Sequence, residues 1–167
     1  MMIIINEGDG KGKTTAAMGQ AIRAHGQGMT VKVIQLIKSG PSGELEMLRE
    51  LGIKVEQYGL GFTDKGDKSM HKIAAERGLQ AINKAIDSGK FEMIICDEIN
   101  YAVSGGLINE EDVLNLINKA KENNVHIVMT GRNPTDKMIE SADIVTNMVK
   151  VKHAFDTGIE AQLGIEY

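Results

Sequence analysis

The sequence predicts a doubly wound α/β domain in which a mainly parallel β-sheet is covered by helices on both faces. Short apolar runs alternate with longer stretches of helix-forming residues along the whole 167-residue chain. Because the apolar runs are continuous rather than alternating, they indicate strands buried on both faces, as in parallel sheets. No repeat, low-complexity tract or linker divides the chain. Its length suits one hydrophobic core, so we expect a single domain over residues 1–167.

Strand-like and helix-like stretches follow one another in order, as in a chain of βα units. The expected strands are four continuously apolar runs, 2–5, 31–37, 93–96 and 126–129, and a weaker candidate, 53–58. The expected helices are 13–25, 44–51, 70–88, 110–123 and a short one from 134 to about 141. Their ends are predicted from turn and capping residues: Gly26, Gly52 and Gly89 as C-terminal glycines, Asn109 as an N-cap, and Asn133-Pro134 as cap and first position of the last helix.

The composition indicates which kinds of binding partner and which cellular compartment the protein can have. The net charge is −4 at pH 7, so the chain has no basic field that would attract nucleic acid or an anionic membrane. Cys96 is the only cysteine, which excludes a disulfide within the chain and fits a reducing compartment. Met1 leads directly into the first expected strand, and no apolar run reaches membrane-spanning length. We therefore expect a cytoplasmic protein with neither a nucleic-acid nor a membrane partner.

The glycine-rich stretch Gly8-Asp9-Gly10-Lys11-Gly12-Lys13-Thr14-Thr15 lies between the first expected strand and the first expected helix. A strand, a glycine-rich turn and a helix in this order predict a phosphate-binding loop. Glycines let backbone N–H groups turn inward, and the helix start adds unpaired N–H groups and the positive end of its dipole. Lys13 supplies a cation for the outer phosphates, and the Thr14 hydroxyl is suited to bind Mg²⁺. Glu7 replaces the usual first glycine, and Lys11 adds a second cation.

Charged residues also follow two other expected strands. Asp97 and Glu98 end the apolar run 93–96, at the position where phosphate-loop proteins bring an acid to the magnesium ion. Since adjacent strand residues face opposite ways, we expect one carboxylate to face the metal and the other to brace the loop. Arg132 follows the run 126–129. It is expected in the crevice at the carboxyl ends of the strands, where a guanidinium suits phosphate oxygens.

Two features leave more than one interpretation open. Arg23 lies roughly two and a half turns after Lys13 on the first helix, where it is either a ligand contact or a plain surface charge. Loops 38–43 and 59–67 are longer than packing requires, and both leave strands at the expected ligand edge. Phe62, in the second loop, is either a lid over a flat ligand or an anchor tucked into the core.

Several motifs together resemble the ATP:cob(I)alamin adenosyltransferases of the phosphate-loop type. They are the glycine-rich loop continued through Ala16-Ala17, the run Asp97-Glu98-Ile99-Asn100-Tyr101, and Thr130-Gly131-Arg132. The most specific signal is the C-terminal run Val151-Lys152-His153-Ala154-Phe155-Asp156-Thr157-Gly158 with Ala161-Gln162-Leu163-Gly164-Ile165-Glu166-Tyr167, which no general ATPase needs. The similarity covers nearly the whole chain and implies a phosphate-loop NTPase-like, RecA-like fold.

The resemblance implies an enzyme in which the Co(I) of a reduced corrinoid attacks C5′ of ATP and triphosphate leaves. Lys11, Lys13 and the loop from Gly8 to Thr15 would then hold the triphosphate and stabilise its developing charge. Thr14 and Glu98 match the Mg²⁺ ligands, with Asp97 behind them. Among the remaining matched residues, Arg23 and Arg132 match arginines near the nucleotide, and Phe62 matches an aromatic that presses on the lower corrinoid face. A homodimer and a flavoprotein-type reductant are the implied protein partners.

Two departures from the family pattern concern the corrinoid. Asp64 stands where some members carry a tryptophan, and the sequence starts at the first strand, without the N-terminal helical extension of longer members. A more open site or a different corrinoid preference is therefore expected.

Two other classes of function remain. One is a conventional phosphate-loop ATPase or small-molecule kinase, which would yield ADP, and the other is a module that binds ATP or a corrinoid without chemistry.

Overall fold

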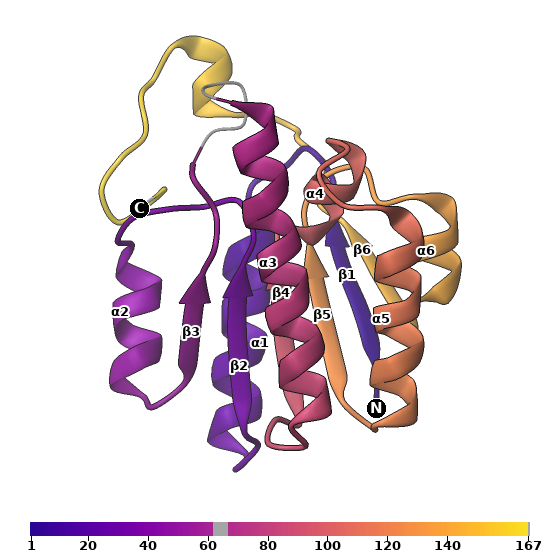
Figure 1. Cartoon of the computed structure of the whole chain (residues 1–167). Coiled ribbons are helices and arrows are strands. Elements are labelled where there is room, and N and C mark those ends of the chain that lie inside the picture. Colours follow the sequence, from indigo (N-terminus) through magenta and orange to yellow (C-terminus); the bar gives the residue numbers. More distant parts are fainter. Residues whose placement is uncertain (62–66, 167) are drawn as a thin grey trace.

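The computed structural model describes residues 1–61 and 67–166. Its centre is a parallel sheet with the strand order β3-β2-β4-β5-β1-β6. The strands are β1 (Ile3–Glu7), β2 (Val31–Gln35), β3 (Lys54–Gln57), β4 (Met93–Asp97), β5 (His126–Thr130) and β6 (Ile144–Asn147) (Figure 1). The strand β5 therefore separates β1, which leads into the glycine-rich loop, from β4, which leads into the acidic pair.

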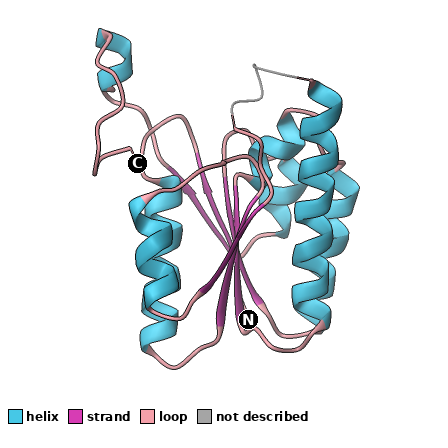
Figure 2. Cartoon of the chain, turned by 60° about the vertical axis from the view of Figure 1, so that its left-hand side comes forward, coloured by secondary structure: helices cyan, strands magenta, loops and turns pink. Residues whose placement is uncertain are grey.

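Helices cover both faces of this sheet (Figure 2). One face carries α1 (Lys13–Gly26) and α2 (Gly43–Glu50), and the other carries α3 (Lys68–Asp87), α4 (Ile99–Ser104), α5 (Glu110–Glu122) and α6 (Asp136–Ser141). A 3₁₀ turn, Ala154–Thr157, lies in the C-terminal segment. The predicted doubly wound α/β fold is thus confirmed. No helix among the described residues is long and apolar enough to cross a membrane.

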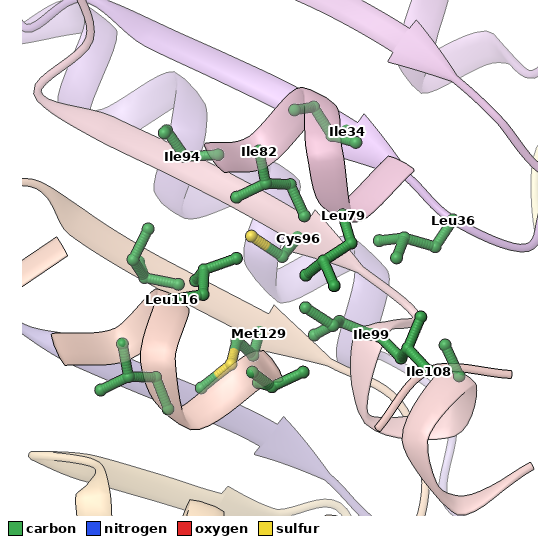
Figure 3. Packing of buried hydrophobic residues seen from close by; sticks show 14 of the residues in the cluster. Ile34, Leu36, Leu79, Ile82, Ile94, Cys96, Ile99, Ile108, Leu116 and Met129 are labelled. Atoms are coloured by element: carbon green, nitrogen blue, oxygen red, sulfur yellow. The ribbon is translucent and has the colours of Figure 1, made fainter. Parts of the chain in front are cut away.

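Alternate residues of the central strands enter two separate cores. In β4, Ile94 and Cys96 belong to the core formed with α3, α4 and α5, whereas Met93 and Ile95 belong to the core formed with α1 and α2. Figure 3 shows the first of these cores from close by. A strand covered on both faces must be apolar at successive positions, which explains why continuous apolar runs predicted these strands. Each buried Ile or Leu stabilises the fold by about 1.5–3 kcal/mol.

The predicted element ends are partly confirmed. Gly52 and Gly89 follow α2 and α3 with positive φ, as C-terminal glycines do, and Asn109 is the N-cap residue of α5. Gly26 was expected to end the first helix, but it lies inside α1, and Gly28 is the left-handed glycine that follows.

The start of the last helix is a second correction. Asn133-Pro134 was expected to cap and begin this helix, but α6 begins at Asp136. The cap is Thr135, whose hydroxyl accepts a hydrogen bond from the Met138 N–H at 3.3 Å. A threonine two residues later in the same turn satisfies the free N–H groups of the helix, so the proline lies outside it.

Two elements, β6 and α4, were not predicted. All four residues of β6 are exposed, so this edge strand lacks the apolar run that marks buried strands. The helix α4 has only six residues, too few to show a helical period.

Candidate active site

Residues of β6 and the segment after it shape the glycine-rich loop between β1 and α1. Gly8 and Gly12 have φ values of 104° and 119°, which residues with a side chain rarely adopt. A Cβ atom at Gly8 or Gly10 would collide with the backbone of Met148. The Gly10 N–H also donates to the Met148 carbonyl at 2.6 Å. Close packing therefore requires glycine at both Gly8 and Gly10, and the turn of the loop adds a second reason at Gly8.

The same contact explains why Glu7 stands where phosphate loops usually have a glycine. Glu7 is still part of β1, where it pairs with Asn147 of β6, and its carbonyl accepts the Met148 N–H at 2.8 Å. An extended strand residue needs no glycine, so the loop turns one residue later, at Gly8.

Lys13 is the first residue of α1, and its ammonium lies inside the loop. The Nζ atom donates to the Gly8 carbonyl at 2.7 Å and to the Gly10 carbonyl at 2.8 Å. Burial lowers the pKa of Lys13, and the neighbouring positive charge of Arg132 lowers it further, against the opposing effect of Glu98. A partly desolvated ammonium next to another cation is stabilised by an anionic ligand. The Lys13 ammonium thus lies at the loop, where an anionic ligand would offset its partly desolvated charge.

Asp97 is fully buried and its two oxygens receive hydrogen bonds from three elements. Oδ1 accepts from the Thr14 hydroxyl at 2.8 Å and from the Thr130 hydroxyl at 2.7 Å, and Oδ2 accepts from the Gln35 amide at 2.9 Å. The carboxylate therefore ties β4 to α1, β5 and β2 at the ligand edge. Its place behind Thr14 is that of a brace for the loop.

Glu98 follows Asp97 with a left-handed backbone, φ 65°, and is the N-cap residue of α4. Its backbone N–H donates to the Thr130 hydroxyl at 2.9 Å, which holds the turn. Burial raises the pKa of the Glu98 carboxyl, and the adjacent Asp97 charge raises it further, opposed by Lys38, Lys13 and Arg132. Glu98 lines both pockets at this edge, whereas Asp97 is fully buried, and a nearby cation stabilises the ionised Glu98 carboxylate.

The side chains around Thr14 are of the kind that Mg²⁺ prefers, namely hydroxyl and carboxylate oxygens. Within residues 1–61 and 67–166 there is no group of three or more His, Cys, Asp or Glu side chains arranged to hold a metal. Mg²⁺ sites commonly use one or two protein oxygens, with substrate phosphates and water as the other ligands. Thr14 and Glu98 fit such a site.

Two adjoining pockets open at this edge of the sheet. A pocket of about 440 Å³ is lined by residues that include Lys11, Lys13, Thr14 and Thr15, and we call it the phosphate pocket because it adjoins the predicted phosphate-binding loop. The neighbouring pocket, of about 510 Å³, is lined by side chains from the ends of β2, β3 and β5 and from α4, including Gln35, Gln57, Tyr101 and Arg132. Both pockets share the residues Lys38, Glu44, Glu98 and Glu166.

Ion pairs cross the rim of the two pockets. The Nε of Arg132 lies 3.1 Å from Oδ1 of Asp9, so the arginine reaches from the β5 loop to the glycine-rich loop. The Nζ of Lys11 lies 3.7 Å from Oε1 of Glu166. The C-terminal segment therefore places a carboxylate against one of the two loop lysines.

The structure brings most of the predicted site residues together. The loop residues Gly8 to Thr15 lie with Asp97, Glu98 and Arg132 at one edge of the sheet. Arg23 does not join them: it lies in the last turn of α1, ten residues after Lys13, so the helix carries it about 15 Å away from the loop. Phe62 and Asp64 lie outside the described residues.

Several residues of the pockets were not predicted as site residues, including the following four. Gln35 and Gln57 are polar residues at the carboxyl ends of β2 and β3, Lys38 is in the loop after β2, and Tyr101 is on α4. A polar residue that follows an apolar run is the signal that would have identified Lys38, whereas Gln35 stands inside the expected run 31–37. Tyr101 was not predicted to line a pocket because its position depends on α4, and that helix was not predicted from the sequence.

Known proteins with a similar sequence share one description. The family model for "ATP:corrinoid adenosyltransferase BtuR/CobO/CobP" matches residues 1–167. The chain belongs to this family. This adenosyltransferase is an enzyme whose substrates are ATP and a corrinoid. The conventional ATPase or kinase alternative finds no support in these matches.

The curated relatives resemble the adenosyltransferase along nearly its whole length. A corrinoid adenosyltransferase of Escherichia coli is 36% identical over 168 residues, which are 99% of this chain and 85% of the relative. One from Sinorhizobium sp is 36% identical over 171 residues, 99% of this chain and 80% of the relative. One from Pseudomonas aeruginosa is 37% identical over 170 residues, with 99% and 83% covered.

Gly10→Ala should damage the loop because the new Cβ meets the Met148 backbone. We expect a loss of stability of about 1–3 kcal/mol, as for overpacked sites, together with at least about tenfold weaker ATP binding because the loop N–H groups are displaced. Chemical denaturation and calorimetric titration with ATP measure the two effects. Gly19→Ala, in α1 with open space around its Cβ position, is the matched control and should not weaken ATP binding. Normal ATP binding by Gly10→Ala would contradict the packing role.

Glu166→Gln should strengthen triphosphate binding, because the Glu166 carboxylate competes with phosphate for Lys11. An exposed pair of this kind contributes up to about 1 kcal/mol, so inorganic tripolyphosphate should bind up to about fivefold more tightly, and less so at high salt. Calorimetric titration at two salt concentrations tests this. Glu160→Gln, on the same segment, should change nothing. Weaker binding by Glu166→Gln would show that the carboxylate assists the ligand.

Proposed function

We propose that this enzyme transfers the 5′-deoxyadenosyl group of ATP to the Co(I) of a reduced corrinoid and releases triphosphate. The observation that supports the proposal is the pocket with two lysines, Lys11 and Lys13, which directly adjoins a second pocket in a chain of this family. A pocket that holds the phosphates beside a separate acceptor pocket suits a reaction in which the phosphates leave together.

The bond changes define what the protein residues must do. The electron pair of Co(I) forms the bond to C5′ of ATP while the bond from C5′ to the α-phosphate oxygen breaks, and that electron pair leaves with the triphosphate. Negative charge therefore accumulates on the leaving group. Lys11 and Lys13 line the phosphate pocket and, with the N–H groups of the glycine-rich loop, would stabilise that charge mainly in the transition state.

We further propose that the reaction uses Mg²⁺ held by Thr14 and Glu98. The ion, when bound, would neutralise part of the triphosphate charge. Asp97 would not bind the metal directly in this arrangement. Its Oδ1 accepts from Thr14 and Thr130, so it keeps the Thr14 oxygen lone pairs turned toward the pocket.

Arginine and aromatic residues complete the proposal. Arg132 lines the acceptor pocket and reaches Asp9 of the loop, which suits a role beside the nucleotide. Arg23, also matched to the family's arginines, lies at the far end of α1 and would need a different conformation to contact ATP. Phe62, by resemblance, would press on the lower face of the corrinoid.

The partners of the enzyme are proposed on similar grounds. Two features support a homodimer. The C-terminal segment exposes apolar side chains of its own, among them Val151, Phe155 and Leu163, and the edge strand β6 is also exposed. A flavoprotein-type reductant would supply the electron that makes Co(I). A cytoplasmic setting fits Cys96, a lone buried cysteine whose thiol pKa is raised by burial.

Lys13→Ala should reduce the rate of adenosyl transfer about 10²–10³-fold, as expected when one group that stabilises a leaving anion is removed. The reaction contains ATP, Mg²⁺ and chemically reduced cob(I)alamin. The adenosylated corrinoid is identified because light destroys it, and the phosphate product is identified by ³¹P NMR. Triphosphate should be the main ATP-derived product. Lys84→Ala, on the exposed side of α3, is the control. Orthophosphate and ADP as main products would overturn the proposed reaction, and a normal rate for Lys13→Ala would overturn the role of Lys13.

Phe62→Ala should impair the reaction mainly when it starts from cob(II)alamin, because reduction to Co(I) is easier once the lower axial ligand is excluded. Starting from chemically reduced cob(I)alamin, the rate should stay near that of the wild type. Parallel assays from the two oxidation states measure the difference. An equal loss from both would contradict a role at the lower corrinoid face.

A further inference from the structure

Lys38, in the loop after β2, contacts the same atoms that the proposed Mg²⁺ site requires. Its Nζ donates to the Thr14 hydroxyl oxygen at 3.1 Å and lies 3.7 Å from Oδ2 of Asp97. The Thr14 hydroxyl gives its one proton to Asp97, so the ammonium uses an oxygen lone pair that faces the pocket. A metal ion bound to Thr14 would use that lone pair too.

The charges around Lys38 explain why a cation is held there. Asp97 has no exposed surface, and the adjacent Glu98 is also largely shielded from water. Two neighbouring carboxylates in such a place are costly unless a positive charge compensates them. Lys38 lies 3.7 Å from Asp97, whereas the Lys13 ammonium donates to loop carbonyls. Among the described residues, Lys38 is thus the lysine whose ammonium lies within ion-pair distance of Asp97.

Lys38 also lies where the two pockets meet, because it lines both of them. Its side chain remains 42% exposed, so it has room to leave Thr14. The backbone around it is anchored: the Gln57 amide donates to the Gly40 carbonyl at 3.0 Å and to Gln35 Oε1 at 2.9 Å, and the Gly61 N–H donates to the Ile37 carbonyl at 3.0 Å. A change at Lys38 can thus be confined to its flexible side chain.

We propose that Lys38 compensates the acidic pair while the Mg²⁺ position is empty, is displaced from Thr14 when the ion binds, and then binds the triphosphate at the boundary of the two pockets. This inference rests on the proposed function, since it takes triphosphate as the group that the pocket holds. Like charges repel strongly at such short range, so the ammonium and the ion do not share the Thr14 oxygen. Lys38 would then be a third lysine, after Lys11 and Lys13, that stabilises the leaving group.

The test separates the two roles of Lys38 because Lys38→Met should change two affinities in opposite directions. Mn²⁺ binding to the nucleotide-free protein, followed by electron paramagnetic resonance, should become about threefold tighter or more, because no ammonium competes for the site. Tripolyphosphate binding at saturating Mg²⁺, followed by calorimetry, should become about tenfold weaker, because one charge-assisted contact is lost.

Two variants serve as controls. Lys38→Arg keeps the charge and should keep both affinities near those of the wild type, and Lys84→Met, on the exposed side of α3, should change neither. Thermal unfolding of all variants confirms that each is folded. Unchanged affinities, or both affinities weakened together in Lys38→Met, would overturn the proposal and leave Lys38 a packing residue. Neither measurement involves a corrinoid or adenosyl transfer, so a failure here is distinguishable from a failure of the proposed reaction.

Discussion

The buried carboxylate of Asp97 is the constraint on which the ligand edge of this enzyme depends. An ionised carboxylate removed from water costs several kcal/mol unless its oxygens are hydrogen-bonded and its charge is balanced. Here the donors come from α1, β5 and β2 through Thr14, Thr130 and Gln35. Moving any one of these elements would remove one of the three hydrogen bonds to the carboxylate. The edge is therefore held in one arrangement before any substrate binds.

A second constraint acts on the opposite side of the glycine-rich loop. The Met148 segment, which continues β6, packs so closely on Gly8 and Gly10 that no side chain fits there. The loop is thus held between the Asp97 network on one side and the β6 segment on the other. A rigid loop places its N–H groups without further rearrangement when phosphate arrives, which is what electrostatic stabilisation of a leaving group requires.

Much of this arrangement could be predicted from the sequence, because local residue patterns indicate it. Continuous apolar runs predicted the buried strands β1, β2, β4 and β5, and the placement of the acidic pair after such a run predicted its position beside the loop. The edge strand β6 was not predicted because its residues are exposed and do not form a continuous apolar run. The contact between Met148 and Gly10 joins residues far apart in the chain, and no local signal marks it.

The side chains around the pockets were harder to predict for the same reason. Lys38 was visible as part of a long loop, but its contact with Thr14 depends on β2 and β4 being neighbours, with α1 packed across them. The approach of Glu166 to Lys11 likewise depends on how the C-terminal segment returns over the loop. The predicted site residues, such as Asp97 and Arg132, directly follow continuous apolar runs, whereas no local pattern marks the contacts of Lys38 and Glu166.

The residues that line both pockets carry charges of both signs, and these charges affect how readily triphosphate is released after the reaction. Glu44, Glu98 and Glu166 stand there with Lys38, while Lys11 and Lys13 stand in the phosphate pocket. A pocket lined by lysines alone would bind triphosphate as a product as tightly as it binds it in the transition state, and such uniform binding does not accelerate the reaction. Acidic residues beside the lysines lower the affinity for the free anion and favour the cations that accompany ATP. The mixture of signs therefore suits an enzyme that must hold three phosphates during bond breaking and then release them as one molecule.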